Sequence, residues 1–222
     1  MTIQWLGGDT ILLTSKLREK GNVTVVADPV GPFSPARIPK NLKADIVIGS
    51  FSQNEHDIML KSADGERPPI VIRSPGEYER GGVFVTGIAG WAFGGAMSTL
   101  YRIDAEELSI GYLAGAMDRL DEGRLSPFEG VHILVLPFGG LQEGKGLALE
   151  DARELVQTLE PLAVIPIRIK DSTYPSAKSL QEVGRALGVT PTISESALKL
   201  TRSHLGDGET LLLFGFEQHV NG

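Results

Sequence analysis

Glycine and proline divide this chain into short apolar runs, and that division restricts its fold more than any other feature of the sequence. The chain contains 27 glycines and 13 prolines. The runs between them are rich in Val, Ile and Leu and are about as long as a β-strand. None approaches the roughly 20 apolar residues that a membrane-spanning helix needs. The pattern therefore predicts many short strands and no contact with a membrane.

Strand patterns dominate before about residue 120, and strand and helix patterns alternate after it. We expect strands at residues 2–6, 10–14, 22–27, 44–49, 70–73, 83–88, 100–103, 108–113, 131–136, 163–169 and 209–216. Helical spacing predicts helices over residues 147–159 and from 175 or 176 to about 187, the second capped by Gly188. Turns are expected at residues 7–9, 81–82 and 87–95. No linker is visible, so we expect one α/β domain over residues 1–222.

Charge and cysteine content exclude several classes of function. The net charge is −7, and no run of Lys and Arg offers the basic face that nucleic acids or anionic membranes require. The absence of cysteine removes disulfides, thiolate metal sites and cysteine nucleophiles. The first residues show neither a charged n-region nor a long apolar h-region. We therefore expect a cytoplasmic protein that binds no nucleic acid.

Several short motifs occur in an order that resembles the metallo-β-lactamase superfamily. They are Trp5-Leu6-Gly7, Ala27-Asp28-Pro29, the strand from Ala44 to Ile48, Ser74-Pro75-Gly76-Glu77-Tyr78-Glu79, Leu134 to Gly140, and Val164-Ile165-Pro166. The branch that they resemble most is typified by L-ascorbate-6-phosphate lactonase. This resemblance implies a four-layer αββα sandwich of two mixed sheets, and hydrolysis by one or two zinc ions whose bound water is activated for attack.

The resemblance also identifies the positions where that family holds its metal, and most of them carry other residues here. The family's His-x-His-x-Asp-His loop falls on Phe51, Gln53, Glu55 and His56, so only His56 matches. The remaining positions, where the family has His or Asp, fall on Gly8, the segment Tyr112 to Gly115, and Arg168. A guanidinium repels a cation and does not ligate it. We therefore expect that the ancestral zinc is lost and that no cofactor replaces it.

The sequence leaves open what the altered pocket does. Arg168 could replace the charge of the metal and pair with Glu55 or Asp28, could hold a small anionic ligand, or could form a purely structural ion pair. His56 is either a remaining general base or a histidine held by a hydrogen bond. Other residues that we expect near the pocket, as lining or as filling, are Phe51, Gln53, Glu77 and Tyr112.

We therefore expect a pseudoenzyme that binds a ligand or another protein, and a homo-oligomer is compatible with the sequence. The alternative is a hydrolase with a rearranged site, either metal-free with His56, Glu55 and Arg168 as catalytic candidates or holding one weakly bound metal. A third interpretation comes from residues 139–146, which fit the phosphate-binding pattern G-x-x-x-x-G-K. Gly146 occupies the place of the Ser or Thr that binds Mg²⁺, so this pattern favours an ordinary loop.

Overall fold

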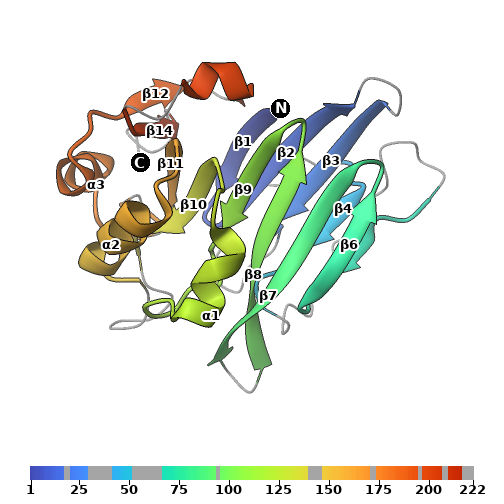
Figure 1. Cartoon of the computed structure of the whole chain (residues 1–222), viewed down its shortest axis with the longest axis horizontal. Helices are drawn as coiled ribbons and strands as arrows, with labels where there is room; N and C mark the ends of the chain where they lie inside the picture. The colour runs from blue at the N-terminus through green and yellow to red at the C-terminus, as the bar shows by residue number, and fades with distance from the viewer. Residues whose placement is uncertain are drawn as a thin grey trace.

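Two mixed β-sheets packed face to face form the body of the fold in the computed structural model (Figure 1). The structure describes residues 1–17, 21–29, 42–51, 67–93, 96–139, 147–170, 174–194, 197–206 and 210–216. Within these ranges one sheet has six strands and the other has eight. The arrangement confirms the α/β sandwich of two mixed sheets that the sequence predicts.

The six-stranded sheet comes mainly from the first third of the chain. Its strands, in spatial order, are β13 (Leu198–Lys199), β1 (Thr2–Gly7), β2 (Thr10–Leu17), β3 (Gly21–Ala27), β4 (Ile46–Ile48) and β5 (Ile70–Ile72). The pairs from β13 to β3 are antiparallel, whereas β3, β4 and β5 are parallel. The carboxyl ends of β3, β4 and β5 therefore lie at one edge of this sheet.

The eight-stranded sheet contains most of the remaining strands. Its spatial order is β12 (Thr192–Ser194), β14 (Leu212–Phe216), β11 (Ala163–Ile167), β10 (Ile133–Pro137), β9 (Leu108–Tyr112), β8 (Ala96–Ala105), β7 (Val83–Phe93) and β6 (Gly76–Arg80). The strands from β6 to β9 are antiparallel, and those from β9 to β12 are parallel. The carboxyl ends of β9, β10 and β11 thus also share one edge.

Side chains alternate between two apolar layers along the central strands, because successive residues of a strand point to opposite faces. In β10, Ile133 and Val135 pack between the sheets, and Leu134 and Leu136 pack under the helices. In β4, Ile46 and Ile48 likewise face the other sheet. These strands are apolar on both faces because both faces are covered, which explains their continuous hydrophobic runs.

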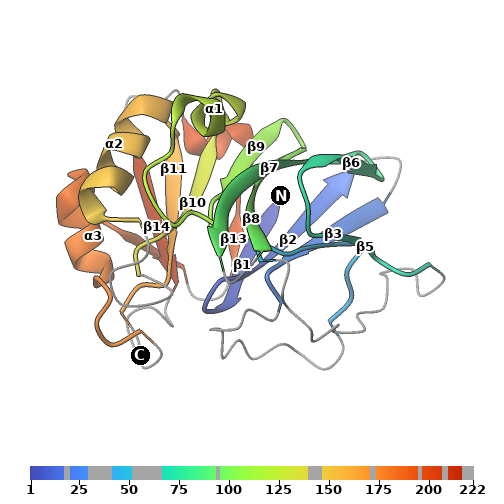
Figure 2. The ribbon, with the colours of Figure 1, turned by 90° about the horizontal axis from the view of Figure 1, so that it is seen from below.

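Short helices cover the outer face of the eight-stranded sheet (Figure 2). They are α1 (Glu122–Leu125), α2 (Leu149–Leu159) and α3 (Leu180–Leu187), with 3₁₀ turns at Ser126–Phe128 and Arg202–Leu205. The buried face of α2 consists of Ala152, Leu155, Val156 and Leu159, the spacing that places apolar residues on one side of a helix. No helix in the described ranges combines the length and the apolar character needed to cross a bilayer.

The expected elements are found with a few differences of physical interest. Helix α3 starts at Leu180 rather than near residue 175, because a capping box lies directly before it. The side chain of Ser179 accepts a hydrogen bond from the Glu182 amide, and the side chain of Glu182 accepts one from the Ser179 amide. Strand β7 continues to Phe93, through a segment that was expected to turn. A Cβ on Gly90 would lie 2.2 Å from Ser98 Oγ, so this glycine permits close strand approach. Strands β6, β12 and β13 and helix α1 are not among the elements predicted from the sequence.

Candidate functional site

Five buried polar residues converge where strands of both sheets end. Asp9 lies in the turn between β1 and β2, Asp28 directly follows β3, and Ser50 lies just beyond β4. Tyr112 is the last residue of β9, and Arg168 directly follows β11. None of the five is more than 2% exposed. We call them the buried polar cluster, and their position matches the strand-end location where α/β proteins commonly bind ligands.

Arg168 and Asp9 form a bidentate ion pair inside the protein. The Arg168 Nε donates to Asp9 Oδ1 at 2.6 Å, and Nη2 donates to Asp9 Oδ2 at 2.7 Å. Nη2 also donates to the carbonyl oxygen of Ala114 at 2.8 Å. The parallel fork geometry is the strongest form of an Arg–carboxylate contact. It connects the β1–β2 turn of one sheet to the end of β11 in the other.

Asp28 is held by a second set of hydrogen bonds beside this pair. Its Oδ1 accepts from the Ser50 backbone amide at 2.7 Å, and its Oδ2 lies 2.7 Å from the hydroxyl of Tyr112. The same hydroxyl lies 2.7 Å from the carbonyl oxygen of Asp9. Tyr112 therefore connects the two buried carboxylate residues, and the cluster forms one continuous network.

The backbone is strained at both ends of this network. Asp28 has a φ of 44° and Arg168 a φ of 50°, in the left-handed region that side chains other than glycine rarely adopt. Such conformations cost on the order of 1–3 kcal/mol and are kept only where surrounding contacts enforce them. A Cβ at Gly139 would lie 2.5 Å from the Arg168 carbonyl oxygen, so glycine is needed where the neighbouring strand passes. The fold thus places strain at Asp28 and at Arg168, two members of the buried polar cluster.

Burial and the charge of Asp9 raise the pKa of Asp28 to about 6, although hydrogen bonds from Ser50 and Tyr112 oppose this rise. Protonation of the Asp28 carboxyl fits the geometry, because the single proton of the Tyr112 hydroxyl cannot serve both Asp28 and the Asp9 carbonyl oxygen. An ionised Asp28 accepts from the Tyr112 hydroxyl, whereas a protonated Asp28 can donate to the Tyr112 oxygen while Tyr112 donates to the Asp9 carbonyl. Burial followed by the nearby carboxylates raises the pKa of Tyr112 well above its usual range, so the phenol stays protonated.

Arg168 remains charged despite its complete burial. Burial by itself lowers the pKa of the guanidinium, but the charge and hydrogen bonds of Asp9 outweigh that effect and raise it. A buried cation that is paired in this way is strongly destabilised if its partner is removed. Asp9 is therefore required wherever Arg168 is kept.

The other residues predicted for the pocket lie either apart from the buried polar cluster or outside the described residues. Phe51 is buried and forms a β-bridge with Ser98, which favours filling over lining. Glu77 is exposed on the edge strand β6, and none of the hydrogen bonds that join the buried polar cluster involves it. Gln53, Glu55 and His56 lie outside the described residues, as does the loop from 140 to 146.

The sequence did not identify Asp9 as part of the site. Arg168 pairs with Asp9 and not with Asp28, which was one of its two expected partners. Asp9 is 159 residues away in the chain and belongs to a Gly-Gly-Asp turn, for which turn propensity is sufficient explanation. A usable signal was that Asp9 directly follows Gly8, the position at which the resembled family often carries a histidine.

The metal-centre positions of the resembled family that fall on described residues carry no His, Asp or Glu, whereas Gln53, Glu55 and His56 lie outside those residues. The described residues contain no group of three or more His, Asp or Glu residues placed to hold an ion. At Gly115, where the family has a carboxylate, a Cβ would lie 2.7 Å from the Thr99 carbonyl oxygen. The flanking Ala114 and Ala116 are fully buried and offer only methyl groups. The guanidinium of Arg168 stands at the final histidine position, and its charge opposes that of a metal ion.

Comparisons with known proteins agree with this architecture. Residues 2–168 match the family model of the beta-lactamase superfamily domain. A protein from Thermotoga maritima, assigned to the zinc-dependent hydrolases of the metallo-β-lactamase superfamily, superposes with a TM-score of 0.75 at 20% identity, over 97% of this chain and 99% of that one. Igni18, a metallo hydrolase from Ignicoccus hospitalis, gives a TM-score of 0.64 at 15% identity, over 90% and 99%. No curated protein matches this chain.

Removing one partner of the buried ion pair should strongly destabilise the protein. We expect Arg168→Met and Asp9→Asn each to lower the free energy of unfolding by about 3–5 kcal/mol, since each leaves a buried group without its partner. The double variant should lose clearly less free energy of unfolding than the two single variants lose together. Urea unfolding measures all three. Arg119→Met, which breaks the exposed Arg119–Glu154 pair, is the matched control and should cost at most about 1 kcal/mol. Equal effects of Arg168→Met and Arg119→Met would contradict the assignment.

The stability of the protein should fall as the pH rises through the titration of Asp28. Its pKa is about 6 in the folded state and near 3.8 when unfolded, so the folded state holds the proton more tightly between these values. Asp28 contributes on the order of 3 kcal/mol to the free energy of unfolding below about pH 4, and this contribution is lost above about pH 6. Asp28→Asn, which mimics the neutral acid, should abolish this part of the pH dependence. Parallel pH profiles for wild type and variant would count against the network.

Proposed function

This chain belongs to the metallo-β-lactamase superfamily, and we propose that it is a non-hydrolytic member in which an internal ion pair replaces the metal centre. The observation that supports this proposal is the bidentate contact between Arg168 and Asp9. A zinc ion at the strand ends would face a fixed positive charge and would have to compete with Arg168 for the nearby carboxylate. The charge that the metal supplies in the family is supplied here by the protein.

On this proposal, the role that the fold retains is to bind a ligand or another protein. The hydrogen bonds and the ion pair of the buried polar cluster connect both strand ends through protein groups alone. The rival proposal is a hydrolase that uses His56 and Glu55 with Arg168. In the described residues Arg168 is engaged with Asp9 and Ala114, which favours a structural role for its charge over a role at a substrate.

Elemental analysis and activity assays test the proposal together. After incubation with zinc or manganese and removal of free ions, we expect far less than one metal per chain, because the described donor set is too small. The Thermotoga maritima relative, treated in the same way, is the positive control. We also expect no turnover of lactone, thioester or phosphodiester substrates. Stoichiometric metal that disappears in His56→Ala, or turnover that disappears in Glu55→Gln, would establish the rival proposal instead.

A small anion is the second candidate for what the centre binds. Arg168 Nη1 is buried and has no hydrogen-bond partner among the described residues, so two N–H groups remain for an acceptor. Asp9 already neutralises the guanidinium, and an ionised Asp28 would repel an anion. Anion binding should therefore require the protonated form of Asp28 and should strengthen below about pH 6.

Thermal unfolding in sodium sulfate, with sodium chloride at equal ionic strength as the reference, measures this dependence. A bound anion should raise the Tm more at about pH 5 than at about pH 7.5, through preferential binding to the folded state. In Asp28→Asn the rise in Tm caused by sulfate should be equal at both pH values, since the carboxylate charge that repels the anion is absent. Sulfate also stabilises proteins by exclusion from their surface, but that effect should be the same in both proteins. An increment independent of pH in the wild type would exclude the anion.

A further inference from the structure

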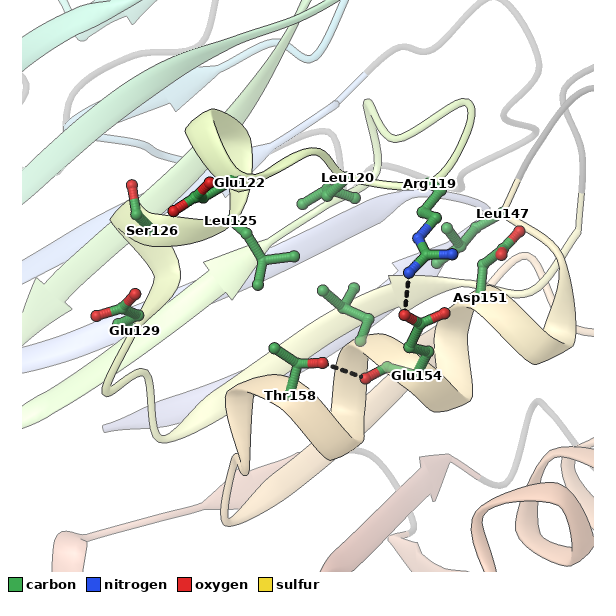
Figure 3. Close-up of a pocket in the computed structure, with 11 residues that line it drawn as sticks. Arg119, Leu120, Glu122, Leu125, Ser126, Glu129, Leu147, Asp151, Glu154 and Thr158 are labelled. Carbon is green, nitrogen blue, oxygen red and sulfur yellow. Dashed lines mark hydrogen bonds and ion pairs between the residues drawn. The ribbon is translucent and has the colours of Figure 1, made fainter.

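A shallow groove lies on the helical layer, apart from the buried polar cluster, between α2 and the segment that contains α1 (Figure 3). Its volume is about 250 Å³. The floor is formed by leucines, among them Leu120, Leu147 and Leu155, which are buried in the core between the helices and the eight-stranded sheet. Leu125 packs against the same core and is half-buried. The floor is therefore fixed in place by the packing of the fold.

The rim of the groove is strongly acidic. Four carboxylates and one guanidinium line it, which gives a net charge of −3. The guanidinium of Arg119 is paired with Glu154, as Figure 3 shows. The other three carboxylates, Glu122, Glu129 and Asp151, form no ion pair among the described residues. The groove thus combines an apolar floor with uncompensated negative charge.

Helix capping explains only part of this charge. Glu122 and Asp151 lie in the first turns of α1 and α2, where a negative charge stabilises the helix dipole. Glu129 follows the 3₁₀ turn and has no such role, although it lines the same groove. Its carboxylate is exposed and forms no ion pair among the described residues, so it is available to a cation.

We propose that this groove binds a small organic cation, a primary amine on an alkyl or aromatic body. The apolar body would cover the leucines, and the ammonium would lie between the carboxylates of the rim, so that both properties of the groove are matched. The volume is below the range of drug-sized ligands and too small for the several successive side chains by which a helix docks. A single short amine fits this size and charge, whereas an anion or a neutral alkane matches only one of the two properties.

NMR titration of the full-length protein with hexylamine tests this assignment. At low ionic strength we expect saturable shifts of the backbone amides of Leu125, Ser126 and Leu155. Hexanol should bind at least about fivefold more weakly because it lacks the charge, and hexanoate should not bind. Added salt should weaken the binding of hexylamine, because the carboxylates are near the surface.

Two glutamine variants distinguish the rim from general surface charge. Glu129→Gln should weaken the binding of hexylamine about two- to fivefold, as expected for one partly screened charge pair. Glu150→Gln removes an exposed carboxylate from the same region without touching the groove, and should leave the affinity unchanged. Both variants alter exposed side chains, so both should fold.

Three results would overturn the proposal. They are the absence of saturable shifts at millimolar hexylamine, equal affinity for hexylamine and hexanol, and equal effects of Glu129→Gln and Glu150→Gln. A short Leu/Lys peptide that shifts the same amides with at least about tenfold higher affinity than hexylamine would assign the groove to a protein partner instead.

Discussion

A guanidinium that has no access to water must find its counter-charge inside the protein, and this requirement organises the centre of the molecule. Arg168 is 0% exposed, and its carboxylate partner comes from the opposite sheet. The pair therefore fixes the end of β11 relative to the β1–β2 turn, and Tyr112 extends the connection to Asp28. The two residues with left-handed backbone, Asp28 and Arg168, lie at the ends of this connection.

In related metal-dependent folds a dication performs a comparable task, since it gathers side chains from several strand ends around one charge. Here the charge is attached to the chain through a covalent side chain. A guanidinium offers directional N–H donors and takes oxygen acceptors, whereas a zinc ion takes lone pairs from nitrogen or oxygen. This preference explains why the surroundings of Arg168 contain a carboxylate and a carbonyl oxygen.

The sequence predicted the framework far better than the centre. The continuous apolar runs of strands such as β4 and β10 depend on local burial, and they were readable because each residue reports its own environment. The motifs also placed Asp28, Tyr112 and Arg168 at strand ends correctly. The partner of Arg168 was not predictable in the same way, because Asp9 is distant in the chain and its local sequence already accounts for a turn. Strand β6 was missed because its residues are mostly exposed, so they carry no hydrophobic period.

The close approach of Gly115 to the Thr99 backbone limits which substitutions this part of the fold accepts. A carboxylate at position 115 would demand movement of a neighbouring strand, and a histidine at position 168 would leave Asp9 without its counter-charge. Each of these two substitutions would therefore be harmful by itself, and either position can change only together with its neighbours. Substitutions that leave the fold intact are therefore expected mainly at surfaces away from these strand ends, where neither the ion pair nor the close backbone contact constrains the chain.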